Sequence, residues 1–283
     1  MSKNVLITGA SGFIGKFLNK KLHSFGNINV LCISRETGFD LSKKGWTESI
    51  SNQNIDTIIH LAQSNFYRDF PNQVEDLVSI NIDATVELLN WARKNKINKF
   101  IFASTGNVYE QANGPYKEDS KLGPNSFYGA TKLAAEHLVN QYQDYFQVIT
   151  LRLFGVYGPG QQDMLIPNII RKINEQEEIG LAQGLGIMLT PIYIDDCIDI
   201  IIGLITEESE KIKNTVFNIA GSETVTLRDI IEIIEKILLV NAKIKITSGE
   251  IAQFVANKNK IDLIFGKTRY TSIEDGLKET IGK

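Results

Sequence analysis

The stretch VLITGASGFIG at residues 5–15 constrains the fold more than any other part of the chain. An apolar, strand-like run leads directly into Gly9, Gly12 and Gly15, and a helical pattern follows them. In such a turn the backbone N–H groups and the helix N-terminus face a pyrophosphate, which approaches closely because glycine has no side chain to block it. The stretch therefore predicts a dinucleotide-binding turn between a strand and a helix.

Short runs rich in Val and Ile alternate with longer amphipathic segments through the first part of the chain. This alternation is typical of an α/β fold with a doubly wound parallel sheet of the Rossmann type. We expect strands at 4–8, 29–33, 57–61, 99–103, 147–153 and 216–219. We expect helices at 13–25, 73–95, 128–145, 194–206 and 227–239.

The alternation weakens after about residue 155, and the loops lengthen. We expect residues 1–155 to form the NAD(P)-binding domain, joined by returning elements at about 191–220. Residues 156–190 and 221–283 then form a smaller C-terminal substrate-binding lobe.

Composition excludes several classes of protein. The formal net charge is -3 and no basic run occurs, which argues against a nucleic-acid-binding surface. The two cysteines and three histidines are scattered without metal-ligand spacing, so we expect no metal site. The first residues lack the pattern of a secretory signal, and no apolar stretch reaches the ~18 residues of a membrane span. We therefore expect a cytoplasmic protein without a membrane partner.

Ser34 and Arg35 follow the second expected strand. An NAD enzyme usually places an acidic residue there, on the ribose 2′-OH. A hydroxyl and a guanidinium suit a 2′-phosphate instead, so the pair favours NADP(H) and leaves NAD(H) open. The alternative is that Arg35 is only a solvated surface charge.

Tyr128 and Lys132 are spaced Y-x-x-x-K at the start of an expected helix, which sets the phenol and the ammonium on one face. Hydride transfer at a carbinol carbon requires a proton to move at its oxygen. A free tyrosine, with a pKa of about 10, is a poor base at neutral pH. A nearby ammonium favours the phenolate. The spacing thus predicts an acid–base pair for an oxidoreductase.

Several motifs together resemble the extended short-chain dehydrogenases/reductases of the NAD-dependent epimerase/dehydratase family. They are TGASGFIG at 8–15, ASTGNVYE at 103–110, YGATK at 128–132, RLFGVYGPG at 152–160, PIYIDD at 191–196 and FNIAGSETVTLRDI at 217–230. The resemblance covers nearly the whole chain. It implies an enzyme in which Thr105 joins Tyr128 and Lys132 as the catalytic group, with its hydroxyl on the reacting oxygen.

The resemblance also implies ligand contacts. Asp40 and Leu41 match the pair that contacts adenine, and Leu61, Ala62 and Gln63 match a turn beside the cofactor in which Gln63 replaces an alanine. His60 and Asn81 are expected to be structural. The full set implied for the cofactor is Gly9, Gly12, Phe13, Ile14, Gly15, Ser34, Arg35, Asp40, Leu41, Leu61, Ala62, Gln63, Ser104, Tyr128, Lys132 and Phe154. The set implied for the substrate is Thr105, Tyr128, Gly155, Met164, Leu165 and Arg171.

Members of this family mostly act on nucleotide-linked sugars and are commonly homodimers, joined through the helices that correspond to 73–95 and 128–145. Gly106 and Asn107 follow Thr105 where dehydratases have Asp-Glu, so a dehydratase is disfavoured. We expect a 4-ketoreductase, with an NAD-dependent 4-epimerase as the alternative. A reductase of a non-sugar ketone and a non-catalytic dinucleotide-binding protein remain open.

Two departures weaken the match at the nucleotide diphosphate. Gly155 replaces an asparagine, and Leu189 stands where the family motif has an arginine. Arginine forks ordinarily hold a pyrophosphate. The diphosphate site is therefore expected to be built differently or to be absent.

Overall fold

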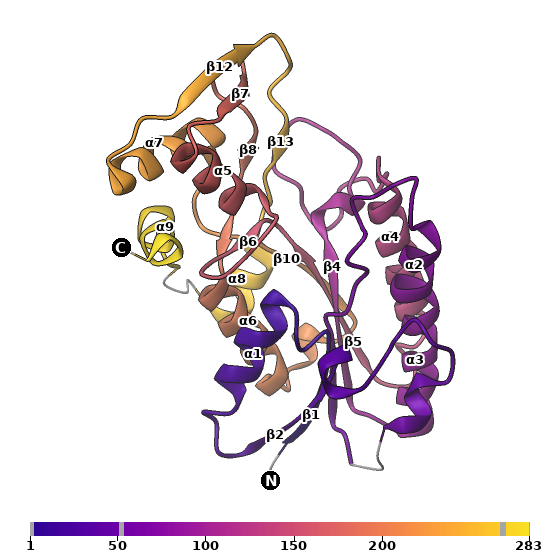
Figure 1. Ribbon diagram of the computed structural model, residues 1–283. Helices are drawn as coiled ribbons and strands as arrows, with labels where there is room; N and C mark the ends of the chain where they lie inside the picture. Colours follow the sequence, from indigo (N-terminus) through magenta and orange to yellow (C-terminus); the bar gives the residue numbers. More distant parts are fainter. Residues whose placement is uncertain (1–2, 51–53, 267–269, 283) are drawn as a thin grey trace. The chain divides into compact units, whose positions relative to one another are not determined.

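The main sheet has six strands in the order β10-β5-β4-β3-β1-β2 (Figure 1). The computed structural model describes residues 3–50, 54–266 and 270–282. β1 pairs in parallel with β2 and β3, and β3 pairs in parallel with β4. The strands are β1 (Lys3–Thr8), β2 (Ile28–Ile33), β3 (Thr57–His60), β4 (Lys99–Thr105), β5 (Gln147–Leu153) and β10 (Thr215–Ile219).

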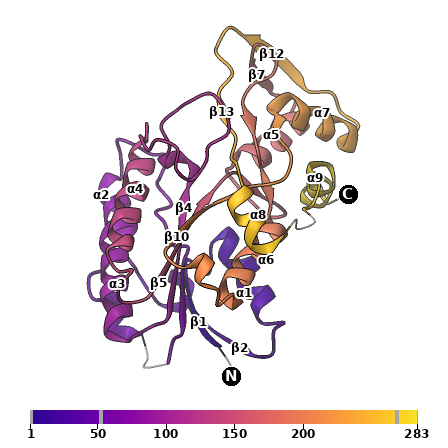
Figure 2. The same cartoon turned by 180° about the vertical axis from the view of Figure 1, so that it is seen from behind.

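Helices cover both faces of this sheet, as the two opposite views show (Figures 1 and 2). One face carries α2 (Val74–Val78), α3 (Ala84–Lys94) and α4 (Phe127–Asn140). The other carries α1 (Phe13–Leu22) and α6 (Ile194–Thr206). The central strands are apolar on both sides for this reason, and every residue of β3 and β4 is buried.

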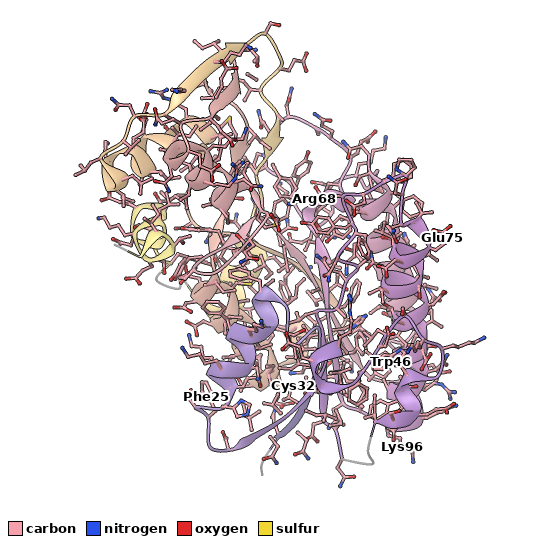
Figure 3. The ribbon with its side chains drawn as sticks, in the orientation of Figure 1. Phe25, Cys32, Trp46, Arg68, Glu75 and Lys96 are labelled. Carbon is pink, nitrogen blue, oxygen red and sulfur yellow. The ribbon has the colours of Figure 1, made fainter. Side chains whose placement is uncertain are left out.

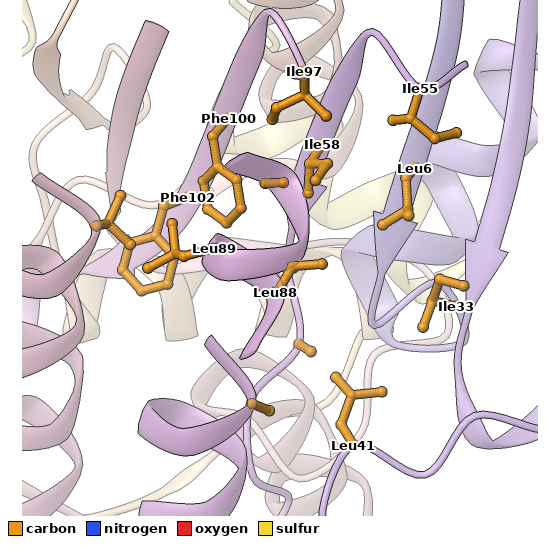
Figure 4. Close-up of a cluster of buried hydrophobic side chains, with 14 of the residues drawn as sticks. Leu6, Ile33, Leu41, Ile55, Ile58, Leu88, Leu89, Ile97, Phe100 and Phe102 are labelled. Carbon is orange, nitrogen blue, oxygen red and sulfur yellow. The ribbon is translucent and has the colours of Figure 1, made fainter. Parts of the chain in front are cut away.

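The core between the sheet and α3 is built from large side chains of alternate strand positions. Leu6, Ile58 and Phe100 are fully buried there, and Leu88 and Leu89 of α3 pack against them (Figure 4). This packing fixes the ends of β3 and β4, from which the polar residues described below project.

The chain divides into two units, each made of three chain segments. Unit 1 contains Met1–Gln111, Asp119–Arg152 and Ile198–Phe217, and unit 2 contains Ala112–Glu118, Leu153–Cys197 and Asn218–Lys283. The described residues of unit 2 form three small sheets, ordered β11-β8-β13, β12-β7 and β6-β9. Its strands are β6 (Val156–Tyr157), β7 (Glu178–Ala182), β8 (Met188–Leu189), β9 (Ile192–Tyr193), β11 (Val225–Thr226), β12 (Lys243–Thr247) and β13 (Gln253–Phe254). Its remaining helices are α5 (Leu165–Asn174), α7 (Leu227–Leu238), α8 (Asn259–Phe265) and α9 (Ile273–Ile281).

The α/β Rossmann class expected from the sequence is confirmed, and the expected main-sheet strands are present. The helix expected at 73–95 is interrupted by a π-helical turn at Ser79–Asp83, which separates α2 from α3. Such turns often occur at functional sites. The segment Ala112–Glu118, which belongs to unit 2, was not anticipated. Within the described residues, no helix is long and apolar enough to cross a membrane.

Candidate active site

Two glycines of the turn after β1 have no room for a side chain. Gly9 has φ +69°, and a Cβ on it would lie 2.8 Å from the backbone nitrogen of Ala62. A Cβ on Gly15 would lie 2.3 Å from the carbonyl oxygen of Gly9. Gly12 is the N-cap of α1 and has an extended backbone. Because glycine has no capping side chain, the first N–H groups of the helix are not covered by one. Phe13 and Ile14, the first two residues of α1, are half-buried.

Two residues expected to contact the cofactor, Ser34 and Arg35, follow β2 and differ in exposure. Ser34 is buried, and its hydroxyl caps the turn Arg35–Thr37 together with Thr37. Arg35 is exposed. Asp40 accepts hydrogen bonds from the backbone and side chain of Ser42, which lower the pKa of its carboxyl group. The side chain of Leu41 belongs to the core.

The three expected catalytic residues all lie in unit 1. Thr105 is the last residue of β4, and Tyr128 is the second residue of α4. Ser126 caps α4 by accepting a hydrogen bond from the backbone N–H of Gly129 at 3.1 Å. The Tyr128 phenol is hydrogen-bonded to Thr105. Lys132 follows one turn later on the same helix.

Burial changes the acidity of both titratable groups. It raises the pKa of the Tyr128 phenol above its ordinary value, and Tyr67 adds to the rise, while the hydrogen bond with Thr105 opposes it. Burial lowers the pKa of Lys132 to about 7, and Glu136 acts in the opposite direction. The Lys132 ammonium lies 4.2 Å from the centre of the Phe102 ring. Burial and Tyr67 together therefore favour the neutral phenol of Tyr128 over the phenolate.

A segment after β3 contacts Tyr128 from a different side. The Tyr128 hydroxyl donates to Oε1 of Gln63 at 2.8 Å. The rings of Tyr67 and Tyr128 are 5.1 Å apart. Arg68, labelled in Figure 3, lies over the Tyr67 ring at 4.8 Å. The contacts of Gln63 and Tyr67 with Tyr128 were not expected from the sequence, because they join residues that are far apart in the chain.

The two residues expected to be structural, His60 and Asn81, are both buried. His60 is fully buried, and its two ring nitrogens contact the hydroxyls of Thr8 at 2.6 Å and Thr85 at 2.9 Å. Burial, with a smaller contribution from Lys132, lowers its pKa to about 3, so the ring is neutral. Asn81, in the π-helical turn, accepts from the backbone N–H of Ser64 and donates to Thr131 of α4. It thereby ties the segment after β3 to the helix that carries Tyr128.

A buried network lies one helical turn beyond Lys132. Glu136 accepts hydrogen bonds from Ser104 and from Arg152, the latter at 2.8 Å. Arg152 also donates to the hydroxyl of Tyr109 at 2.9 Å. Ser104 is the residue that the resemblance places beside the cofactor. Its hydroxyl donates to Glu136. The spacing of four residues between Lys132 and Glu136 was the available sign that the two share a helix face.

A nicotinamide dinucleotide fits the residues present in unit 1. The glycine turn leaves a backbone cradle that a Cβ would fill, and Leu61 and Ala62 close it from the end of β3. Phe154, which the resemblance also implies for the cofactor, lies in unit 2. Its ring is fully buried and packs against Phe254 at 4.6 Å, so it is core of unit 2.

Within unit 2, the two departures from the family motif have structural explanations. Gly155 has φ +58°, a left-handed conformation that glycine and asparagine both adopt readily, and a Cβ there would find its nearest neighbour at 3.6 Å. The exchange is therefore tolerated by the backbone. Leu189 is buried in β8, where it pairs with Val225 and Phe254. It is a core residue and presents no group to a ligand.

The other expected substrate residues lie on α5. Met164 precedes its first turn, and Leu165 is 41% exposed. Arg171 is ion-paired with Glu175 and, at 2.6 Å, with Glu177. Its guanidinium already faces two carboxylates, which leaves it poorly suited to hold a phosphate.

Unit 2 contains a hollow of about 430 Å³ that the sequence did not indicate. Its lining is mixed, with Lys258 as its charged residue; Lys258 is bound to Asp262 at 2.6 Å. The lining residues are Pro115, Met188, Thr190, Gly221, Ser222, Thr224, Gln253, Val255, Ala256, Asn257, Lys258 and Asn259. The volume is in the range of small-molecule sites.

A model of the NAD-dependent epimerase/dehydratase family matches residues 5–220. The chain belongs to this family. The resemblance and the enzyme class expected from the motifs are thereby confirmed, and the protein is an NAD(P)-dependent enzyme of the short-chain dehydrogenase/reductase kind. Among the described residues, no group of His, Cys, Asp and Glu side chains could hold a metal ion.

Relatives span almost the whole chain. An uncharacterized UDP-glucose epimerase of Bacillus subtilis is 29% identical over 98% of this chain and 96% of its own length. A dTDP-4-dehydro-6-deoxyglucose reductase of Escherichia coli is 28% identical over 82% of this chain and 80% of its own length. The structure of a UDP-glucuronic acid 4-epimerase from Bacillus cereus, in complex with UDP-glucuronic acid and NAD, has a TM-score of 0.86 at 29% identity and covers 99% of this chain and 98% of that one.

Proposed function

We propose that the protein is a reductase that transfers hydride to C4 of a nucleotide-linked 4-keto sugar, with NADP(H) as its preferred cofactor. The observation that carries the reaction class is the Tyr128 phenol, which is hydrogen-bonded to Thr105 and followed one turn later by Lys132. When bound, the reduced nicotinamide supplies the hydride. Tyr128 supplies the proton to the carbonyl oxygen, Thr105 orients that oxygen, and the Lys132 ammonium stabilises the phenolate that remains.

Arg35 supports the preference for NADP(H). It is exposed at the end of β2, and Ser34 beside it offers no acidic group for a ribose 2′-OH. Exchange of Arg35→Ala is expected to raise the KM for NADPH at least tenfold and to leave the KM for NADH within twofold. Equal effects on both cofactors would contradict this role.

The nucleotide portion of a substrate is proposed to bind in the hollow of unit 2, where Ser222, Gln253 and Asn257 offer hydrogen-bonding groups. UDP, dTDP, GDP and CDP should be compared by thermal shift with the cofactor present. Stabilisation by one of them supports the assignment. No stabilisation by any would contradict a nucleotide-linked substrate.

A 4-epimerase is the second candidate, because UDP-sugar epimerases are among the similar proteins. Oxidation of NADPH by 4-keto sugar nucleotides, followed at 340 nm, tests the reductase. Interconversion of UDP-sugars without net consumption of added cofactor would identify the epimerase instead. The family resemblance also suggests a homodimer joined through the helical segments 73–95 and 128–145, and light scattering would test whether the protein is a dimer.

A further inference from the structure

Gln63 stands where the matching family motif has alanine, and it meets the catalytic hydroxyl directly. Its Oε1 accepts the hydrogen bond from Tyr128 at 2.8 Å. An alanine could not make this contact. The exchange therefore adds a polar group beside the atom at which a proton moves during the reaction.

Neighbouring contacts hold the tyrosine near this amide. Tyr67 packs on the Tyr128 ring, and Phe70 stacks on Phe127 at 5.4 Å. Ser64, the residue after Gln63, is anchored by its backbone N–H to Asn81 at 3.0 Å and by its hydroxyl to Asp76. Gln63 thus extends from a backbone that is fixed on its C-terminal side.

An amide oxygen and a ketone oxygen interact with a phenol in the same way. Each accepts the phenol's hydrogen bond, and neither donates one. A hydrogen bond that the neutral phenol donates stabilises this form over the phenolate. Reduction of a ketone requires the phenol as proton donor, whereas oxidation of an alcohol, the first step of epimerisation, requires the phenolate as base.

We propose that Gln63 is a positioning residue that holds the Tyr128 hydroxyl as a proton donor until a ketone oxygen replaces its Oε1, and that it thereby biases the site toward ketone substrates. This inference rests on the proposed function. In the step it prepares, the carbonyl carbon gains the hydride and both of its electrons from the reduced cofactor. The carbon–oxygen π pair moves to the oxygen, which takes the Tyr128 proton.

Other groups around the Tyr128 hydroxyl also influence its ionisation. The hydrogen bond with Thr105 is the contact that favours the phenolate. Lys132 lies one turn further along α4, with Glu136 beyond it. Tyr67, with Arg68 over its ring, opposes ionisation, and His60 of β3 is neutral. These groups are unchanged when Gln63 is replaced.

The test uses protein labelled with ¹³Cζ-tyrosine and saturated with oxidised cofactor, with the Tyr128 signal assigned from Tyr128→Phe. Gln63→Ala is expected to shift this signal at pH 7 and to lower its titration midpoint by roughly 0.5 to 1 pKa unit, the effect of one hydrogen bond. Gln63→Glu should raise the midpoint, because a carboxylate accepts more strongly and adds negative charge. The matched control is Gln143→Ala, an exposed glutamine just beyond α4, which should leave the signal unchanged.

A Tyr128 signal that has the same position and midpoint in Gln63→Ala as in the wild type would overturn the inference. A higher midpoint in Gln63→Ala would also overturn it, since the amide would then be donating to the phenolate. In the kinetic arm, the alkaline limb of the kcat/KM profile for ketone reduction should move to lower pH more than the limb of kcat, because substrate replaces Gln63 in the complex. If no nucleotide-linked ketone is reduced but the midpoint still falls, the proposed function fails while the role of Gln63 stands.

Discussion

Tyr128 is half-buried and has contacts on several sides. The sequence around it predicts only some of these contacts. The Y-x-x-x-K spacing predicted its pairing with Lys132. The hydrogen bond to Gln63 and the Tyr67 ring contact depend on a segment more than fifty positions earlier, so no local pattern could indicate them.

Removal of the phenol oxygen should abolish proton transfer with little change in the fold. Tyr128→Phe is expected to lower kcat for NADPH oxidation by roughly 10² to 10⁴-fold, the usual worth of a general acid. Steady-state kinetics of NADPH oxidation with a 4-keto sugar nucleotide that the wild type reduces would measure this. Tyr145→Phe, at a ring that is 60% exposed, is the matched control and should keep the wild-type kcat.

His60 makes stability depend on pH. Its pKa in the folded protein is about 3, against an ordinary value of 6.5. As the pH falls below 6.5, the unfolded chain takes up a proton that the folded protein does not, so stability is lost on acidification toward pH 3. Between pH 7 and pH 5 this group should remove about 2 kcal/mol of stability, at about 1.4 kcal/mol for each pH unit below 6.5.

Urea unfolding of His60→Gln at pH 7 and pH 5 would measure that effect. The variant should be less stable at pH 7 but should lose less stability on acidification than the wild type. His23→Gln, at an exposed histidine, should retain the wild-type dependence. An identical pH dependence in His60→Gln and wild type would show that the loss comes from other groups.

At the scale of elements, the contact between the glycine turn and α1 is the tightest feature of the dinucleotide site. A methyl group on Gly15 would overlap the carbonyl oxygen of Gly9 at 2.3 Å, and backbone must move to relieve it. Gly15→Ala is therefore expected to lower both the melting temperature and the affinity for the cofactor. Calorimetric titration with NADPH and thermal unfolding would measure the two effects.

Gly26→Ala provides the comparison for that exchange, since a Cβ at Gly26 meets nothing within 4 Å. It should bind the cofactor like the wild type. If Gly15→Ala behaves as Gly26→Ala does, the close approach of α1 to the turn is not required for binding.

At the scale of the whole molecule, the main sheet is completed by a late strand. β10 occupies one end of the sheet, next to β5. Buried Lys99 of β4 donates to the carbonyl oxygens of Leu204 at 2.7 Å and Glu207 at 2.6 Å. Early and late parts of the chain are thus joined within unit 1.

A fragment that ends at residue 155 should therefore fail to fold. It would lack β10 and the acceptors of Lys99, and it would leave β5 as an unpaired edge and a buried ammonium without partners. We expect a weak near-ultraviolet circular dichroism signal, no cooperative unfolding and aggregation on gel filtration. A monomeric fragment with a cooperative transition would contradict this expectation.

The sequence was most informative where local pattern determines structure. The strands of the main sheet and the glycine turn follow from apolar runs and from backbone geometry, and both were predicted. The packing of Phe254 against the Phe154 ring joins residues one hundred positions apart, so no local pattern could indicate it. The short strands of unit 2, such as β8, have two residues and give no periodic signal.

The burial of Leu189 limits which substitutions unit 2 can accept at this position. Its side chain is 5% exposed in the three-stranded sheet of unit 2. An arginine introduced there by a single mutation would bury a guanidinium without a prepared partner, which costs several kcal/mol. A tolerated change from Leu189 to arginine would therefore require a neighbouring position to supply a partner for the guanidinium first.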